Sequence, residues 1–200
     1  MVAHESLLRE VCGYKGAQPY WDETVDSGAF SASEILEDFG GDGVGEDRCI
    51  AEGPFAKYQL TVGPAYSNTL HCISRRVSDS LSRTTSQEDV DECLAIGNWP
   101  SALSCIEGGL HSGGHNGVGG VMADGVASPG DPLFFLHHAY VDRVWAMWQQ
   151  RWGSEVKGGT FVEGRGVTGN TWLDMSEVVK GATVAEVAKV GEGRTCYVYQ

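Results

Sequence analysis

The chain has 200 residues and a formal net charge of -13, and its apolar content is ordinary for a protein with a buried core. This acidic balance, with no basic stripe, argues against nucleic acid or an anionic membrane surface as a partner. No apolar run is long enough to span a bilayer, and Met1 to Glu10 lack the apolar core of a signal peptide. With no repeat and no linker, residues 1–200 are predicted to form one domain.

The first half of the chain is predicted to be mostly loop after one short helix. Residues 5–12 fit the last turns of a helix, in which Leu7, Leu8 and Val11 are spaced for one buried face. Residues 18–63 are rich in Gly, Pro, Asp and aromatic side chains, which is typical of loops with short elements. Within and after them we predict a short strand at 58–62 and a solvated polar loop at 74–86.

The second half is predicted to be helical around a glycine-rich segment. Two short helices are expected at 87–96 and 99–107, and the glycine-rich segment follows at 108–130. The clearest helix runs from Pro132 to about Trp152, since Asp131 can cap it and proline fits a first helical position. A last short helix is expected at 184–187.

The six cysteines leave the redox state open. None of them stands in a C-x-x-C pair, which argues against a zinc ribbon or a thioredoxin-type motif. An even number permits disulfides, but the pairing cannot be deduced from sequence, and six reduced thiols are an equal alternative.

The histidines carry the strongest chemical signal. Because His111 and His115 are four positions apart, one helical turn would point both imidazoles the same way, which suits two ligands of one metal. The helix at 132–152 offers a third, from His137 or His138. Neighbours on a helix point about 100° apart, so we expect only one of them to serve the same ion. Imidazole suits copper, zinc, iron and nickel alike.

The run from Asp131 to Trp145, DPLFFLHHAYVDRVW, resembles the signature of the second copper site in tyrosinases, catechol oxidases and molluscan haemocyanins. In that signature the ligand falls on His138. The upstream H-x-x-x-H pair of the family is matched by His111 and His115, with glycines after them. The resemblance therefore implies a copper ion held by His111, His115 and His138, while His137 and Asp142 would support the ligands or pack beside them.

The same resemblance implies a fold and a reaction. The fold would be mainly α, a small helical bundle of the dicopper-centre type with long irregular loops. The reaction would be oxidation of phenols or o-diphenols to o-quinones by dioxygen, with two coppers in the intact family. Glu107, four positions before His111, would hold a water near the copper. Ser112 stands where an asparagine accompanies monophenol hydroxylation, which favours diphenol oxidation.

One part of the family pattern is not matched. The ligands of the first copper would have to precede Glu5, and His4 alone is present there. We therefore expect an N-terminally truncated chain, whose missing part could also hold a secretion signal. Three alternatives stay open: an inactive fragment that binds one copper, haemocyanin-like oxygen binding, and a mononuclear zinc hydrolase with an open three-histidine site.

Overall fold

A computed structural model describes residues 1–153, 166–176 and 178–199. The α-helices and strands are α1 (Val2–Cys12), α2 (Glu23–Asp26), α3 (Glu34–Asp38), β1 (Gln59–Leu60), β2 (His71–Cys72), α4 (Asp79–Ser82), α5 (Gln87–Ala95), α6 (Trp99–Ile106), α7 (Ser112–Val118), α8 (Leu133–Trp152), β3 (Trp172–Leu173), β4 (Ala182–Thr183) and α9 (Val184–Val187). A π-helical turn at Glu107–His111 joins α6 to α7, and 3-10 turns lie at Phe30–Ala32, Arg83–Thr85, Gly120–Ala123, Ser128–Gly130 and Gly193–Thr195.

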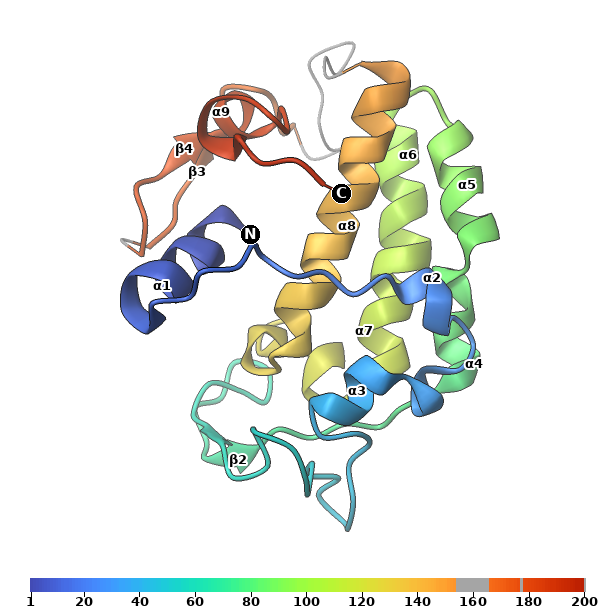
Figure 1. The fold of residues 1–200 in the computed structure, drawn as a ribbon, viewed down its shortest axis with the longest axis vertical. Helices are drawn as coiled ribbons and strands as arrows, with labels where there is room; N and C mark the ends of the chain where they lie inside the picture. The colour runs from blue at the N-terminus through green and yellow to red at the C-terminus, as the bar shows by residue number, and fades with distance from the viewer. Residues whose placement is uncertain (154–165, 177, 200) are drawn as a thin grey trace.

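The fold is mainly α, as the sequence predicted. Helices α5, α6 and α8 run side by side as a small bundle, with α7 continuing from α6 (Figure 1). The described strands form only two short antiparallel pairs, β1 with β2 and β3 with β4. None of the described helices has the length and apolarity needed to cross a membrane.

The bundle core is built by the apolar stripes of the three helices. Buried side chains from α5, α6 and α8 meet in one cluster, which includes Leu94, Trp99, Ile106, Val144 and Trp148. A second cluster lies at the other end of α8 around Trp21, Phe30, Leu36, Val118, Met122 and Leu133. The second cluster joins α7 to α8 through Val118 and Leu133, and the first joins α8 to the π-helical turn through Leu110. The histidines lie on these segments.

The N-terminal helix is present, but its predicted packing is wrong. Helix α1 contains no buried residue, and Val11 is 76% exposed. The helix touches the rest of the chain through His4, whose ring stacks on Phe135 with centroids 3.9 Å apart. The residue spacing therefore predicted the helix correctly, but the described residues do not bury its apolar face.

The segment predicted as a solvated loop at 74–86 is also different. It contains α4 and a 3-10 turn, and Arg75 is fully buried. The guanidinium of Arg75 donates to both oxygens of Asp131, at 2.8 Å each, and its other donors reach backbone carbonyls. The burial of Arg75 could not be predicted from the polar segment around it, because the ion pair joins residues 56 positions apart.

Helix α8 is present as predicted but begins one residue later, at Leu133, with Pro132 in the N-cap position. Asp131 accepts a hydrogen bond from the backbone N–H of Leu133 at 3.0 Å, and Pro132 precedes the first helical residue. The strand predicted at 58–62 shortens to β1, the helices predicted at 87–96 and 99–107 match α5 and α6, and the short helix at 184–187 is α9. For the tail from Gly153 the sequence predicts mixed loop, and residues 154–165 of that tail lie outside the described residues.

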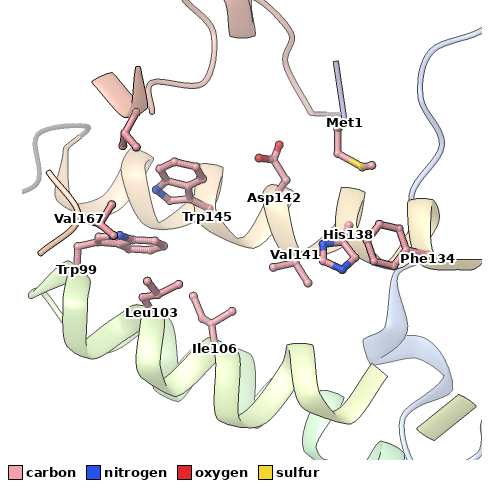
Figure 2. Close-up of a pocket in the computed structure, with 11 residues that line it drawn as sticks. Met1, Trp99, Leu103, Ile106, Phe134, His138, Val141, Asp142, Trp145 and Val167 are labelled. Atoms are coloured by element: carbon pink, nitrogen blue, oxygen red, sulfur yellow. The ribbon is translucent and has the colours of Figure 1, made fainter. Parts of the chain in front are cut away.

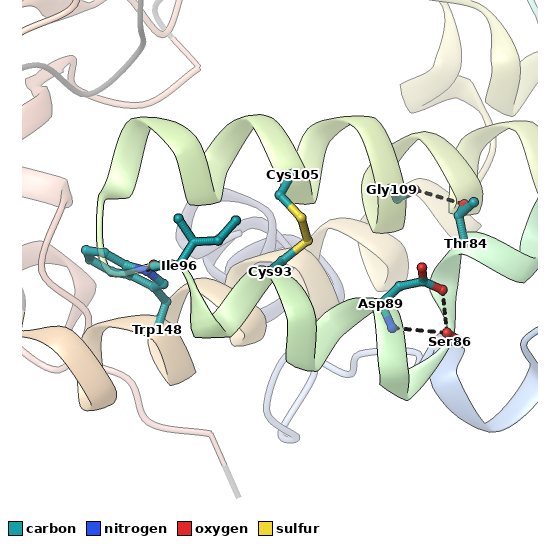
Figure 3. Close-up of a disulfide and its surroundings, with 8 residues drawn as sticks. All are labelled: Thr84, Ser86, Asp89, Cys93, Ile96, Cys105, Gly109 and Trp148. Atoms are coloured by element: carbon teal, nitrogen blue, oxygen red, sulfur yellow. Dashed lines mark hydrogen bonds between the residues drawn. A yellow bond between two sulfur atoms is a disulfide. The ribbon is translucent and has the colours of Figure 1, made fainter.

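Four of the six cysteines form disulfides, which resolves the alternative that the sequence left open. Cys49 bonds to Cys72 and Cys93 bonds to Cys105, while Cys12 and Cys196 carry exposed thiols. Figure 3 shows the second bridge joining α5 to α6, in the same helix pair that leads into the histidine segment.

We expect replacement of both Cys93 and Cys105 by alanine to lower the free energy of unfolding by about 2–4 kcal/mol. The bridge closes a loop with a sequence separation of 12, so losing it gives entropy back to the unfolded chain. Denaturant unfolding followed by circular dichroism measures the loss. Replacing the exposed Cys12 with serine is the control, and equal midpoints for the two variants would contradict the prediction.

Candidate metal centre

Three imidazoles meet at one point between α7 and α8. Nε2 of His115 lies 3.2 Å from Nε2 of His111 and 3.2 Å from Nε2 of His138. His111 ends the π-helical turn, His115 lies on α7, and His138 lies on α8. The structure therefore brings together the three histidines that the sequence singled out as metal ligands.

The local backbone explains how His111 and His115 come to face the same side. The π-helical turn Glu107–His111 passes directly into α7, so the two histidines sit one turn apart on a continuous helical segment. Single π turns inside α-helices are frequent at functional sites. The glycines around the pair let this helix approach its neighbours closely: a Cβ on Gly113 would lie 2.3 Å from Thr84 Oγ1, and one on Gly117 2.8 Å from the Phe30 ring.

The chemistry of these nitrogens fits a metal ion. Nδ1 of His115 donates to the carbonyl oxygen of Met122 at 2.6 Å, so its Nε2 carries a lone pair and no proton. Burial lowers the pKa of His115 to about 4 and that of His138 to about 3, which keeps both imidazoles neutral near pH 7. Converging neutral imidazole nitrogens are the donor set that copper and zinc take in proteins.

Glu107 lies beside the cluster on the solvent side. Its Oε2 is 3.4 Å from Nδ1 of His111, and its side chain is 54% exposed. The contact with His111 lowers the pKa of the Glu107 carboxyl below its usual range. A charged carboxylate thus stands at the edge of the site, in the place where the sequence expected a residue that holds a water.

Ser112 and Asn116 form a polar edge next to Glu107. The Asn116 amide donates to the Ser112 hydroxyl at 2.9 Å, so each fixes the other. Both residues, with Glu107 and all three histidines, line a cavity of about 510 Å³. The imidazoles can therefore be reached from solvent through an opening whose wall carries an amide, a hydroxyl and a carboxylate.

His138 also borders a second, apolar cavity. Figure 2 shows this cavity of about 470 Å³ between α6 and α8, where Leu103, Val141 and Trp145 form the walls. Asp142 lies at its edge but does not contact His138: its Oδ2 accepts hydrogen bonds from the hydroxyls of Tyr197 and Tyr199, at 2.6 and 2.5 Å. Asp142 thus binds the C-terminal segment, whereas the sequence had led us to expect it beside the metal ligands.

The helical angle led us to expect that His137 points away from the cluster, but its ring lies close to the other histidines. Its ring centroid is 5.1 Å from that of His138 and 4.7 Å from that of His115. The error arises because the 100° angle separates Cα–Cβ directions, whereas two long side chains can bend toward the same point. The other two histidines lie elsewhere in the fold. His4 stacks on Phe135, and His71 bonds to the Thr69 carbonyl.

A residue that the sequence did not single out stands behind the cluster. Glu23 on α2 is fully buried, and its Oε1 lies 2.6 Å from Nδ1 of His137. Burial raises the pKa of Glu23 well above its usual range and lowers the pKa of His137 to about 3. Gly114 makes room for this pair, since a Cβ there would lie 2.4 Å from His137 and 2.7 Å from Glu23 Oε2. A lone acidic residue in a predicted loop gave no sequence signal for this role.

The chain is also similar to known proteins. Residues 1–151 match the family described as the common central domain of tyrosinase. The chain is 29% identical to Oxidase hkm6 of Aspergillus hancockii over 98% of its length and 88% of that protein. It is 36% identical to Tyrosinase ustQ of Aspergillus flavus over 75% of its length, but that match spans only 46% of the relative.

The fold also has a solved counterpart. A polyphenol oxidase from Thermothelomyces thermophila superposes with a TM-score of 0.87 at 24% identity, over 99% of this chain and 70% of that structure. The likeness supports a helical fold of the dicopper type. From the matched central domain and the converging histidines, the chain belongs to the tyrosinase family, whose members are copper oxidoreductases.

Proposed function

We propose that His111, His115 and His138 hold copper in this chain, and that residues 1–200 form one tyrosinase-like domain around that ion. The observation that carries the proposal is the convergence of three Nε2 atoms, with His115 3.2 Å from each of the other two. The neutral state of the partly buried His115 and His138 imidazoles and the family match support copper as the metal. The reaction we propose is the oxidation of o-diphenols to o-quinones by dioxygen.

Copper, when bound, supplies the one-electron redox chemistry by which dioxygen oxidises a phenol. Two o-diphenols then lose four electrons and four protons in all, and one dioxygen becomes two waters. The chain supplies the remaining functions. The cavity beside His111 and His138 admits a phenolic ring, and Phe134 in its wall offers an apolar contact. Glu107 accepts a proton from a substrate hydroxyl or from a water that it holds, because its carboxyl is ionised and lies at the cavity edge.

Ser112 and Asn116 favour diphenols over monophenols in this proposal. The Ser112 side chain is shorter than asparagine, and its hydroxyl already accepts a hydrogen bond from the Asn116 amide. Neither side chain therefore takes the place that an asparagine directly after His111 would take. We expect Ser112→Asn to raise the ratio of monophenol to diphenol oxidation in any active form. Oxygen uptake with tyramine and with dopamine measures that ratio, and an unchanged ratio would argue against a role for Ser112.

A second candidate is binding of one ion without turnover. Among the described residues, one group of histidines could hold a metal, and a dicopper reaction needs two such groups. Under this second candidate, the 200-residue chain would bind about one copper equivalent and would not oxidise catechol above a free-copper control. Two equivalents with steady oxygen uptake would instead establish the oxidase. A reversible oxygenated absorption band without turnover would favour oxygen binding of the haemocyanin type.

The ligand assignment has a direct test. We expect His138→Gln to lower copper content to the level of a chelator-treated sample, because removal of one of three donors leaves the ion weakly held. His71→Gln is the matched control, since that imidazole bonds to Thr69. Copper content after gel filtration, measured by atomic absorption, decides the question, and full retention in His138→Gln would refute the assignment.

A further inference from the structure

The polar cavity beside the histidines has an acidic wall. The described residues that line it include two carboxylates, Glu107 and Asp124, and no lysine or arginine. The side chain of Glu107 is 54% exposed and that of its neighbour His111 is 23% exposed, so this carboxylate stands nearer the solvent than the imidazole. Asp124 is partly exposed as well. The negative charge of the cavity therefore lies on its solvent side.

The Asp124 carboxylate is held in place by three backbone N–H groups. One of its oxygens accepts from Ala65 at 2.6 Å, and the other accepts from Val126 and Ala127 at 2.8 and 2.9 Å. These bonds, that from Ala65 foremost, lower the pKa of the Asp124 carboxyl below its usual range, because they stabilise the ionised form. A carboxylate that is already ordered can pair with a cation at a smaller loss of side-chain freedom.

Asp124 is connected to the proposed metal site by a short stretch of chain. The Met122 carbonyl accepts from Nδ1 of His115 at 2.6 Å, and Asp124 follows directly after the 3-10 turn Gly120–Ala123. A phenol that turns its hydroxyl toward the imidazoles directs a para side chain away from them, toward the solvent side of the cavity. The cavity volume of about 510 Å³ has room for the ring and for such a side chain.

We infer that this cavity selects phenols whose side chain carries a cationic amine, and that Asp124 pairs with the amine. The inference rests on the proposed function, because it names the substrate class of that same site. Glu107 adds to the negative field, so a phenol with a carboxylate side chain is repelled by both residues and meets no cation among the described residues of the wall. Because the carboxylates are partly exposed, the preference is modest and weakens as salt is added.

Binding of three monophenols to the copper(II)-loaded chain tests this inference. Tyramine carries an ammonium group near pH 7, para-ethylphenol is neutral and para-hydroxyphenylpropionate carries a carboxylate, while the phenol ring is the same in all three. In the absence of air, the shift of the copper(II) visible band measures each dissociation constant, so binding elsewhere on this acidic protein is not counted. We expect tyramine to bind roughly 3–10-fold more tightly than the propionate at low salt. The two constants should converge at about 1 M salt.

Asp124→Asn shows whether this residue carries the preference. Asparagine keeps an oxygen for the N–H groups of Val126 and Ala127 but removes the charge, so the preference for tyramine should fall about threefold. Asp47→Asn is the matched control, because Asp47 is exposed, lies outside the described cavity wall and changes the net charge equally. An equal fall in both variants would assign the preference to the net charge of the protein and overturn the inference.

The neutral phenol separates failure of this inference from failure of the proposed function. If para-ethylphenol shifts the copper(II) band and all three phenols bind the wild-type chain equally at low salt, the inference is overturned and the proposed function stands. If para-ethylphenol leaves the band unchanged at every concentration, the cavity does not bring phenols to the ion, and both fail. The salt series uses the wild-type chain alone, so it decides the question even where Asp124→Asn does not fold.

Discussion

Replacing Gly114 with alanine is expected to weaken copper binding by roughly 10–100-fold. The added Cβ would lie 2.4 Å from Cε1 and Nδ1 of His137, closer than real Cβ contacts come, so the buried ring or α7 must shift. His115 lies one position along the same helix, and its Nε2 moves with that shift away from His111 and His138. Competition with a chelator measures the affinity, and denaturant unfolding should show an overpacking loss of about 1–3 kcal/mol.

Gly108→Ala is the matched control for this experiment. Gly108 belongs to the π-helical turn that precedes His111, yet a Cβ there would meet nothing within 4 Å. A second control combines Gly114→Ala with His137→Ala, which removes the ring that the new methyl group meets. The double variant should regain stability relative to the sum of the single changes, as coupled neighbours do. Equal affinities of the Gly108 and Gly114 variants would contradict the expected clash.

Replacing Arg75 with methionine is expected to lower the free energy of unfolding by about 3–5 kcal/mol. Arg75 and Asp131 are both fully buried, and two 2.8 Å hydrogen bonds join them. Removing the guanidinium leaves an uncompensated carboxylate in the interior at the start of α8, the helix that carries His137 and His138. Urea unfolding followed by circular dichroism measures the loss, and copper content should fall with it.

The double variant Arg75→Met with Asp131→Leu separates the cost of an orphaned charge from the value of the pair. Because the apolar pair leaves no buried charge without a partner, this variant should be more stable than Arg75→Met alone. The partly exposed pair Arg48–Asp42, at 2.7 Å, is the surface control, and Arg48→Met should change stability by no more than about 1 kcal/mol. Similar losses for Arg75→Met and Arg48→Met would show that the buried pair carries no special weight.

Much of the site could be derived from local sequence because its spacing follows from one helix turn. The four-residue interval from His111 to His115 places both rings on one side, and the signature around His138 supplies the third. Helix α8 was equally readable, since Asp131, Pro132 and its apolar stripe are local signals. Those features need no knowledge of which distant segments meet.

The tertiary structure decided the rest, because long-range contacts leave no mark in a local window. Glu23 meets His137 across 114 positions, and Arg75 meets Asp131 across 56. The approach of the His137 ring to the cluster depends on side-chain rotation and on the space beside Gly114, neither of which a helical wheel contains. The sequence by itself determined helices α5, α6 and α8 and the spacing of the three converging histidines. Only the packing of α2 and α7 on α8 determined what stands behind them, since burial and charge partners are set by the whole fold.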